Sequence, residues 1–146
     1  MQASVLQRDE TATMRDLGFD TPEREAAMMA CSPDCIKLLS ADGAIAYMSQ
    51  NGLCAMEIPA LSNILGKFWP DLWPESQRDL VASAVTAAGQ GKTVNFVADC
   101  PTALGNPARW DVTVQGVFAP DGQLIEIISV SRLTKDPLRA LSVVQT

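Results

Sequence analysis

The sequence predicts an α+β domain in which short helices and one longer helix pack over one face of a five-stranded antiparallel sheet. Two short β-prone segments, 35–39 and 44–48, come first, and three longer ones follow a helical region. Asp42-Gly43 between the first two is a typical hairpin turn. A sheet with one apolar face needs a covering layer, and the helices between the second and third strands supply it.

Length and composition indicate one globular domain. The chain has 146 residues, of which 47% are hydrophobic and 19% are charged, which suits a single domain with a buried core. We divide it into a flexible lead-in at 1–20, a folded domain at 21–135 and a tail at 136–146. We expect the tail to form a helix or the start of a signalling linker.

Charge and residue content exclude several classes of function. With 11 basic and 17 acidic residues, the chain has a formal net charge of −6, and such a chain repels nucleic acid. Histidine is absent, which excludes histidine-dependent catalysis and haem held by histidine. No segment resembles a signal peptide or a membrane span. We therefore expect a cytoplasmic protein that binds no membrane and no metal, with its four cysteines reduced.

A first helix is expected over 21–31. Thr21 suits the N-cap, Pro22 suits the first helical position, and Ser32-Pro33 ends the helix. A helix this short is not stable alone. Its alanine and methionine face must therefore dock on the outer face of the sheet or on a second copy of the chain.

The chain then predicts a hairpin, a short helix and one long helix. The hairpin joins Cys35–Leu39 to Ala44–Met48, and the short helix lies over Leu53–Ile58. Pro74-Glu75 begins the long helix and Gly89 ends it. The apolar stripe of this helix consists of Leu80, Val81, Ala84, Val85 and Ala88.

Three strands complete the sheet, and the first two alternate regularly. One face of the third strand carries Val94, Phe96 and Ala98, and one face of the fourth carries Trp110, Val112, Val114 and Phe118. The last run, QLIEIISVSRL, is the most β-prone and is expected at the centre of the sheet. It has apolar residues on both faces, because Ile125 and Ile127 alternate with Ile128.

In this order, the segments SPDCIKLLSADGAIAYMSQNG, ILGKFWPDLWPE and WDVTVQGVFAPDGQLIEIISVSRLT resemble a PAS domain, over about residues 22–135. The resemblance implies a sheet of spatial order 2-1-5-4-3 and a cytoplasmic sensor and dimerisation module used in signal transduction. Some PAS domains hold flavin, haem or small metabolites, and others hold no known ligand. Light-sensing members carry a cysteine in the region after the first hairpin. The equivalent segment here, ALSNILGKFWPDLW, has none, so the cysteine-adduct chemistry of LOV domains is not expected.

Aromatic residues provide the candidate ligand site. We expect Trp69, Phe96 and Trp110 to form the walls of a pocket for a planar ligand on the concave sheet face. Asn95, or alternatively Asn51, is the candidate polar contact to the ring edge. The resemblance makes flavin, as FAD or FMN, the leading cofactor. In the alternative interpretation these rings fill the core, and the protein is a ligand-free dimerisation or interaction module.

The segment CPTALGNP, residues 100–107, is longer than the usual connection between adjacent antiparallel strands. Its two prolines restrict its conformations. We favour a stiffened surface loop. The alternative is a rigid flap beside the pocket, next to Trp110 at the pocket mouth.

Association with other chains is expected through the outer sheet face. Apolar residues on the first helix and the last strand, Met28, Ile125 and Ile127, predict a homodimer. A downstream signalling protein of unknown identity is the other expected partner. Catalysis is not expected, because the inward strand faces carry no carboxylate. A small enzyme on a similarly curved sheet is the remaining alternative.

Overall fold

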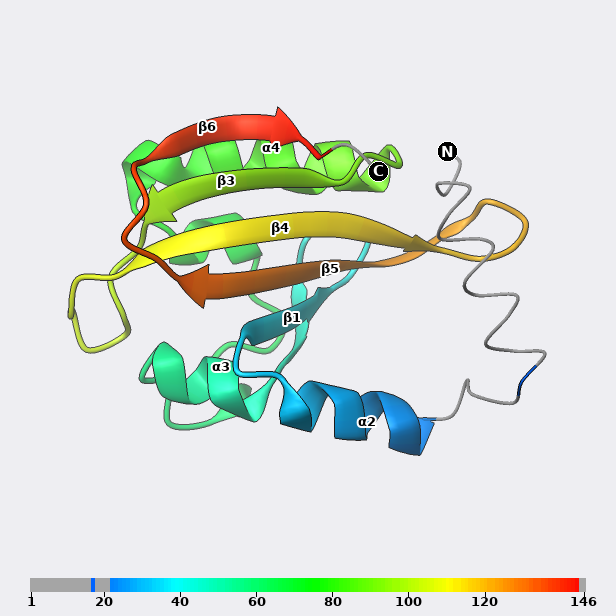
Figure 1. Cartoon of the computed structure of the whole chain (residues 1–146), viewed down its shortest axis with the longest axis horizontal. Helices are drawn as coiled ribbons and strands as arrows, with labels where there is room; N and C mark the ends of the chain where they lie inside the picture. The colour runs from blue at the N-terminus through cyan, green and yellow to red at the C-terminus, as the bar shows by residue number, and fades with distance from the viewer. Residues whose placement is uncertain (1–16, 18–21, 145–146) are drawn as a thin grey trace.

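The computed structural model describes residue 17 and residues 22–144. Figure 1 shows one antiparallel sheet with α4 behind it and α3 and α2 below β1. The spatial order of its six strands is β2-β1-β5-β4-β3-β6. The strands are β1 (Cys35–Leu39), β2 (Ile45–Met48), β3 (Val94–Asp99), β4 (Arg109–Phe118), β5 (Leu124–Leu133) and β6 (Arg139–Val143). The helical segments are α2 (Pro22–Cys31), α3 (Gln50–Ala55), η1 (Leu61–Asn63), η2 (Trp69–Leu72), η3 (Glu75–Gln77) and α4 (Arg78–Gly89).

The predicted α+β fold is confirmed, including the order 2-1-5-4-3 of the first five strands. Along β4, every second residue from Trp110 to Phe118 is buried. This pattern follows from the strand period of two, which sends successive side chains to opposite faces. β5 lies between β1 and β4, which is the central position expected of the most β-prone run.

A sixth strand, β6, is the main addition to the predicted sheet. The tail was expected to form a helix or the start of a linker, but β6 pairs antiparallel with β3 at the edge of the sheet. Asn95 stands opposite Ser142, and Val97 stands opposite Arg139. The strand forms because the unpaired backbone groups at the edge of β3 are a ready template for pairing with another strand. This pairing joins segments far apart in the sequence, so local periodicity does not reveal it.

α3 begins earlier than expected, at Gln50 rather than Leu53. The reason is Ser49, whose Oγ accepts a hydrogen bond from the N–H of Gly52 at 3.2 Å and so caps the helix directly after β2. A Cβ on Gly52 would lie 2.6 Å from the Cys35 sulfur. The glycine therefore permits α3 to pack closely on β1.

α4 covers the inner face of the sheet, as predicted. Four residues of its apolar stripe are buried: Val81, Ala84, Val85 and Ala88. The helix approaches β4 most closely at Gly116, where an added Cβ would lie 2.6 Å from the Ala88 carbonyl oxygen. A side chain at this position would push the helix off the strand.

The two isoleucines predicted for the outer face of β5 lie in different environments. Ile125 is 56% exposed, whereas Ile127 is 0% exposed and belongs to the core cluster. The register between β4 and β5 shifts at Val117–Phe118, so that Phe118 pairs with Leu124 while Val117 pairs with Glu126. The prediction for Ile127 is therefore wrong, because Ile127 pairs with Gly116 in the regular register and faces inward with Ser129 and Ser131, whereas the bulge at Ile125 leaves that residue exposed.

The first predicted helix is confirmed as α2, and none of its residues is buried. Met28 is 61% exposed. The charge of Glu25 adds to burial in raising the pKa of Glu126, which places α2 near the outer face of β5. The lead-in expected at 1–20 lies outside the described residues except for residue 17.

Candidate functional site

Four small or polar side chains form a group on the inner face of β1 and β5: Cys35, Lys37, Ser129 and Ser131. Lys37 stands opposite Ser129, and Cys35 stands opposite Ser131. Side chains paired across antiparallel strands have Cβ atoms about 5 Å apart. The group therefore forms one compact polar patch within an otherwise apolar layer.

Lys37 is 5% exposed. Its Nζ lies 3.1 Å from the Cys35 sulfur and 5.6 Å from the centroid of the Trp69 ring. Within the described part of the chain, no carboxylate lies within ion-pair distance of this nitrogen. Thiol sulfur is a weak acceptor. Burying an ammonium group without an anion costs several kcal/mol. Lys37 is therefore a candidate for a functional role.

The two serines of the patch are also unusual. Ser129 is 0% exposed and Ser131 is 3% exposed, and neither hydroxyl oxygen has a hydrogen-bond partner among the described residues. Leaving a buried hydroxyl unsatisfied costs about 1–3 kcal/mol. Together with Lys37, the serines leave an excess of hydrogen-bond donors facing the core.

A cavity of about 30 Å³ adjoins this patch. This volume holds about two water molecules. Its lining consists of Lys37, Met48, Met56, Ile58, Trp69, Leu72, Trp73, Cys100, Trp110 and Ser131. The polar groups Lys37 and Ser131 come from β1 and β5, while the other lining residues come from β2, β4, the residue after β3 and the helical segments with their loops. The arrangement is that of an apolar pocket with a few convergent polar groups.

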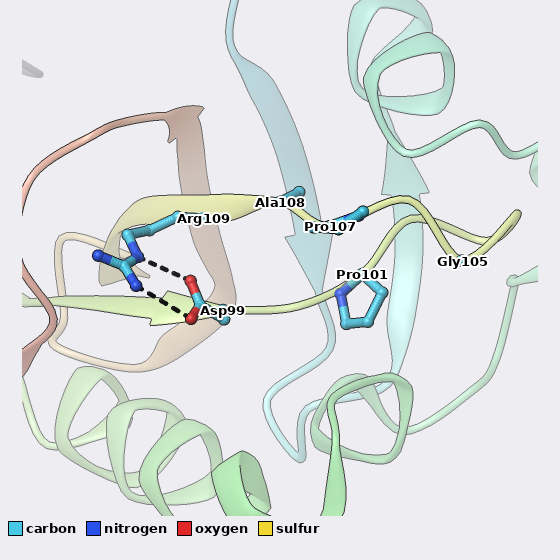
Figure 2. A pocket seen from close by; sticks show the side chains of 6 residues that line it. All are labelled: Asp99, Pro101, Gly105, Pro107, Ala108 and Arg109. Atoms are coloured by element: carbon cyan, nitrogen blue, oxygen red, sulfur yellow. Dashed lines mark hydrogen bonds and ion pairs between the residues drawn. The ribbon is translucent and has the colours of Figure 1, made fainter.

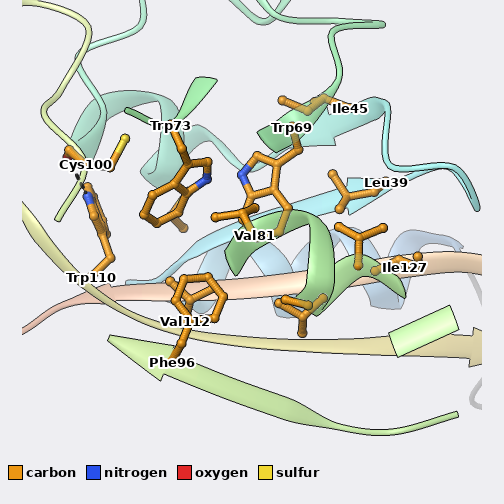
Figure 3. Packing of buried hydrophobic residues seen from close by; sticks show 14 of the residues in the cluster. Leu39, Ile45, Trp69, Trp73, Val81, Phe96, Cys100, Trp110, Val112 and Ile127 are labelled. Atoms are coloured by element: carbon orange, nitrogen blue, oxygen red, sulfur yellow. Dashed lines mark hydrogen bonds between the residues drawn. The ribbon is translucent and has the colours of Figure 1, made fainter. Parts of the chain in front are cut away.

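The predicted aromatic walls meet at this cavity only in part. Trp69 of η2 and Trp110 of β4 line it, together with Trp73, which directly follows η2 (Figure 3). Phe96 is buried but packs behind Trp73, with ring centroids 5.7 Å apart in an edge-to-face geometry. Trp69 and Trp73 make a similar edge contact at 6.0 Å. The rings thus pack on one another as well as on the cavity.

Asn95 lies on the opposite face of the sheet, so its predicted contact with a ligand in this cavity is wrong. Its amide donates hydrogen bonds to Asp111 at 2.7 Å and to Thr113 at 3.1 Å, and its oxygen accepts one from Arg139 of the edge strand. The alternation of β3 places Val94 and Phe96 inward and Asn95 outward. Asn51 is exposed and donates to the Ser32 carbonyl, so it does not reach the cavity either.

The connection 100–107 is attached to the segment that carries two cavity-lining residues, Met56 and Ile58. The Ala103 N–H donates to the Met56 carbonyl at 2.9 Å. Thr102 and Asn106 both donate to the Glu57 carboxylate, and these hydrogen bonds lower the pKa of Glu57. This geometry favours the flap interpretation over a simple surface loop.

Trp110 joins the base of this connection to the cavity wall. Its indole Nε1 donates to the Cys100 carbonyl oxygen at 3.0 Å, and the ring is 3% exposed. The Cys100 thiol also lines the cavity. Burial raises the pKa of this thiol, and the charge of Lys37 partly opposes that shift. The Cys100 sulfur is therefore held mainly in its neutral, weakly nucleophilic form.

A second, open hollow of about 440 Å³ lies on the other side of the connection (Figure 2). Its lining consists of Asp99, Pro101, Gly105, Pro107, Ala108 and Arg109. Asp99 and Arg109 form a two-bond ion pair at 2.7 and 3.2 Å, and Arg109 also donates to the Asp136 carbonyl. Because its charges already satisfy each other, this hollow is a weaker candidate than the cavity at Lys37.

The described residues hold neither a metal-ion cluster nor a membrane-spanning helix. Residues 17 and 22–144 contain no cluster of three or more histidine, cysteine, aspartate or glutamate side chains suited to a metal ion. In the same residues, no helix has the length and apolar character needed to cross a bilayer.

The sequence reasoning missed Lys37. A signal was present, because the alternation of β1 places Lys37 between Cys35 and Leu39 on the inward face. A lysine flanked by two core positions in a central strand predicts a buried cation. Its two serine neighbours come from β5, and only the strand pairing brings them to it.

Comparison with known proteins agrees with the architecture. The model of the PAS fold family matches residues 30–135. A PAS domain of an HTR-like protein from Haloarcula marismortui is 18% identical over 88% of this chain and 99% of that chain, with a TM-score of 0.64. A domain of a sensory box histidine kinase/response regulator from Geobacter sulfurreducens is 17% identical over 82% and 98%, with a TM-score of 0.67.

A light-oxygen-voltage domain, from work that used a flavin analogue to study its mechanism, is also similar in structure. It is 16% identical over 82% of this chain and 89% of that chain, with a TM-score of 0.63. No curated protein sequence matches the chain. Identities this low establish the fold only, but the family match covers most of the sequence. The chain therefore belongs to the PAS fold family.

Proposed function

We propose that this protein is a cytoplasmic sensory module that binds a small molecule in the cavity at Lys37. PAS domains are sensory signalling modules. The observation that carries the proposal is the buried Lys37 beside two hydroxyls without partners, in a pocket walled by tryptophan. A ligand that accepts hydrogen bonds there would reduce both the cost of the buried ammonium and the cost of the unsatisfied hydroxyls. The free state of all four cysteines agrees with a reducing compartment.

The cavity size favours a ligand much smaller than flavin. Sites for drug-sized ligands measure about 300–1,000 Å³, at least ten times the volume of the cavity found here, about 30 Å³. An isoalloxazine ring would have to displace Trp69 and Trp73, which pack on each other and on Phe96. FMN or FAD remains the second candidate, and its support is the similarity in fold to a light-oxygen-voltage domain whose mechanism was studied with a flavin analogue.

For the output, we propose a homodimer formed by α2 and the outer face of β5. α2 has ten residues and none of them is buried, and a helix of this length needs packing to be stable. Met28 and Ile125 are the exposed apolar residues that a partner copy would cover. Ile127, which was predicted for this interface, is not part of the proposed one because it is buried in the core. The domain would then pass the signal to a downstream signalling protein and would not itself catalyse a reaction.

A filled-core module without a ligand is the alternative function. Its support is the close packing of the three tryptophans, which leaves little space between them. Dimerisation through α2 would then be the whole function of the domain.

A visible absorption spectrum and native mass spectrometry of the freshly purified protein distinguish these functions. A small bound species of less than flavin mass supports the proposal. A flavin absorption band with a released flavin would replace it with the second candidate. An unliganded mass that no candidate metabolite changes would favour the filled-core module.

A further inference from the structure

We propose that the cavity at Lys37 is a site for the carboxylate group of a short-chain aliphatic monocarboxylate. This inference rests on the proposed ligand-binding function and names the chemical class of the ligand. The Lys37 ammonium and the Ser131 hydroxyl are the donors that line the cavity, and Ser129, directly opposite Lys37, completes the donor patch. All three side chains are more than nine-tenths buried.

The charge of the lining selects an anion over a neutral ligand. Lys37 is the sole charged residue of the cavity lining. No carboxylate of the described residues lies within ion-pair distance of its ammonium. Water satisfies hydrogen bonds but leaves the charge unbalanced. A carboxylate does both, through charge-assisted hydrogen bonds that are about twice as strong as neutral ones.

The number of charges selects a monoanion over a dianion. A phosphate or a dicarboxylate would bring a second negative charge into a lining with one cation, and an uncompensated buried charge costs several kcal/mol. The two oxygens of a single carboxylate suit donors on neighbouring strands, which lie about 4.8 Å apart. Lys37 on β1 and Ser131 on β5 are diagonal neighbours across this pair of strands, about 7–8 Å apart, a span that one carboxylate bridges by accepting one hydrogen bond at each oxygen.

The rest of the lining selects an aliphatic tail. Met48, Met56, Ile58 and Leu72 have no group that hydrogen-bonds strongly. Methionine side chains adapt to irregular shapes, so Met48 and Met56 provide the extra room that a few carbon atoms need beyond the existing volume. The ligand is therefore short, with about two to four carbons.

The test is a titration of the whole chain with sodium propionate, with propionamide as the neutral isostere and sodium chloride as the salt control. All three tryptophans line the cavity, so intrinsic fluorescence and the indole N–H signals in NMR spectra report directly on the site. We expect saturable changes with propionate, and binding of propionamide weaker by about tenfold or more, as the loss of a charge-assisted contact implies.

Variants assign the effect to the donor groups. Lys37→Met should weaken propionate binding about tenfold or more, and Ser131→Ala, which keeps the charge, should weaken it several-fold. Lys135→Met changes an exposed lysine and should leave binding unchanged. Equal binding of propionate and propionamide, or unchanged binding by both site variants, overturns the anion assignment but leaves the ligand-binding function standing. No saturable change with either compound up to about 100 mM overturns the carboxylate site. The ligand-binding function would then fail separately, if native mass spectrometry also finds no bound species.

Discussion

Lys37 of β1 and Ser129 of β5 stand directly opposite each other on the inner face of the sheet, and both are buried. A polar pair at the centre of an apolar layer lowers the stability of the domain unless something else satisfies it. The core of this protein is therefore less stable than an all-apolar core would be. This local cost is expected where a fold keeps a binding site.

Replacing Lys37 should stabilise the protein while it removes ligand binding. Lys37→Met keeps an unbranched side chain one atom shorter but removes an ammonium that has no carboxylate partner among the described residues. We expect the free energy of unfolding to rise by about 1 kcal/mol or more, measured by urea denaturation without added carboxylate. Lys135→Met is the matched control and should change stability little. A clear loss of stability in Lys37→Met would mean that its contacts with Cys35 and Trp69 outweigh its desolvation.

Adding one methyl group at Gly116 should destabilise the packing of α4 on β4. In Gly116→Ala, the new Cβ would lie 2.6 Å from the Ala88 carbonyl oxygen. We expect a loss of about 2 kcal/mol, seen as a lower denaturant midpoint. Gly89→Ala is the control, because its Cβ would meet only Leu124, at an ordinary 3.6 Å. Equal midpoints for the two variants would contradict the close approach.

The hydrogen bond from the Trp110 indole to the Cys100 carbonyl should stabilise the start of the flap, the connection 100–107. Trp110→Phe keeps an aromatic ring but removes the Nε1 donor to the Cys100 carbonyl. We expect a cost of about 1 kcal/mol and faster hydrogen exchange at the Ala103 amide, measured by NMR. Trp73→Phe is a suitable comparison, since it also shortens a cavity-lining indole. Exchange at Ala103 that is equally fast in both variants would show that ring size, and not the hydrogen bond, matters.

The attachment of the flap to Glu57 should weaken in acid. Hydrogen bonds from Thr102 and Asn106 lower the pKa of the Glu57 carboxyl in the folded protein. Stabilisation from this contact is therefore complete above the ordinary glutamate pKa of about 4.3. It is lost as the pH falls through the lowered value. Protection of the Ala103 amide should fall in this range, and Glu57→Gln should remove the dependence, whereas Glu75→Gln on the surface should not. A parent protein with pH-independent protection would disprove the link.

The proposed dimer should dissociate when charge is placed on its exposed apolar residues. Met28→Glu and Ile125→Glu should each halve the mass measured by light scattering after size exclusion, because a buried, unpaired carboxylate opposes association. Leu104→Glu is the control, since Leu104 is 75% exposed on the flap, away from the interface. If both variants keep the mass of the parent, the interface lies elsewhere.

Local patterns in the sequence were sufficient for most of the fold. The alternation in β4, the hairpin turn at Asp42-Gly43 and the apolar stripe of α4 each depend on neighbouring residues, so they could be predicted without the structure. The same alternation indicated that Trp110 faces the core. The alternation of β3 also places Asn95 outward. The assignment of Asn95 to the ligand site therefore conflicted with the strand pattern.

Tertiary structure decided the features that depend on pairing between distant segments. β6 pairs with the edge that β3 offers, and the bulge at Ile125, where the register of β4 and β5 shifts, leaves Ile125 exposed while Ile127 is buried opposite Gly116. The site follows the same rule. The sequence places Lys37 on an inward face, but only the antiparallel pairing of β1 with β5 brings Ser129 and Ser131 beside it. Sequence alone therefore determined which side chains face the core, and the register between strands decided which of them meet.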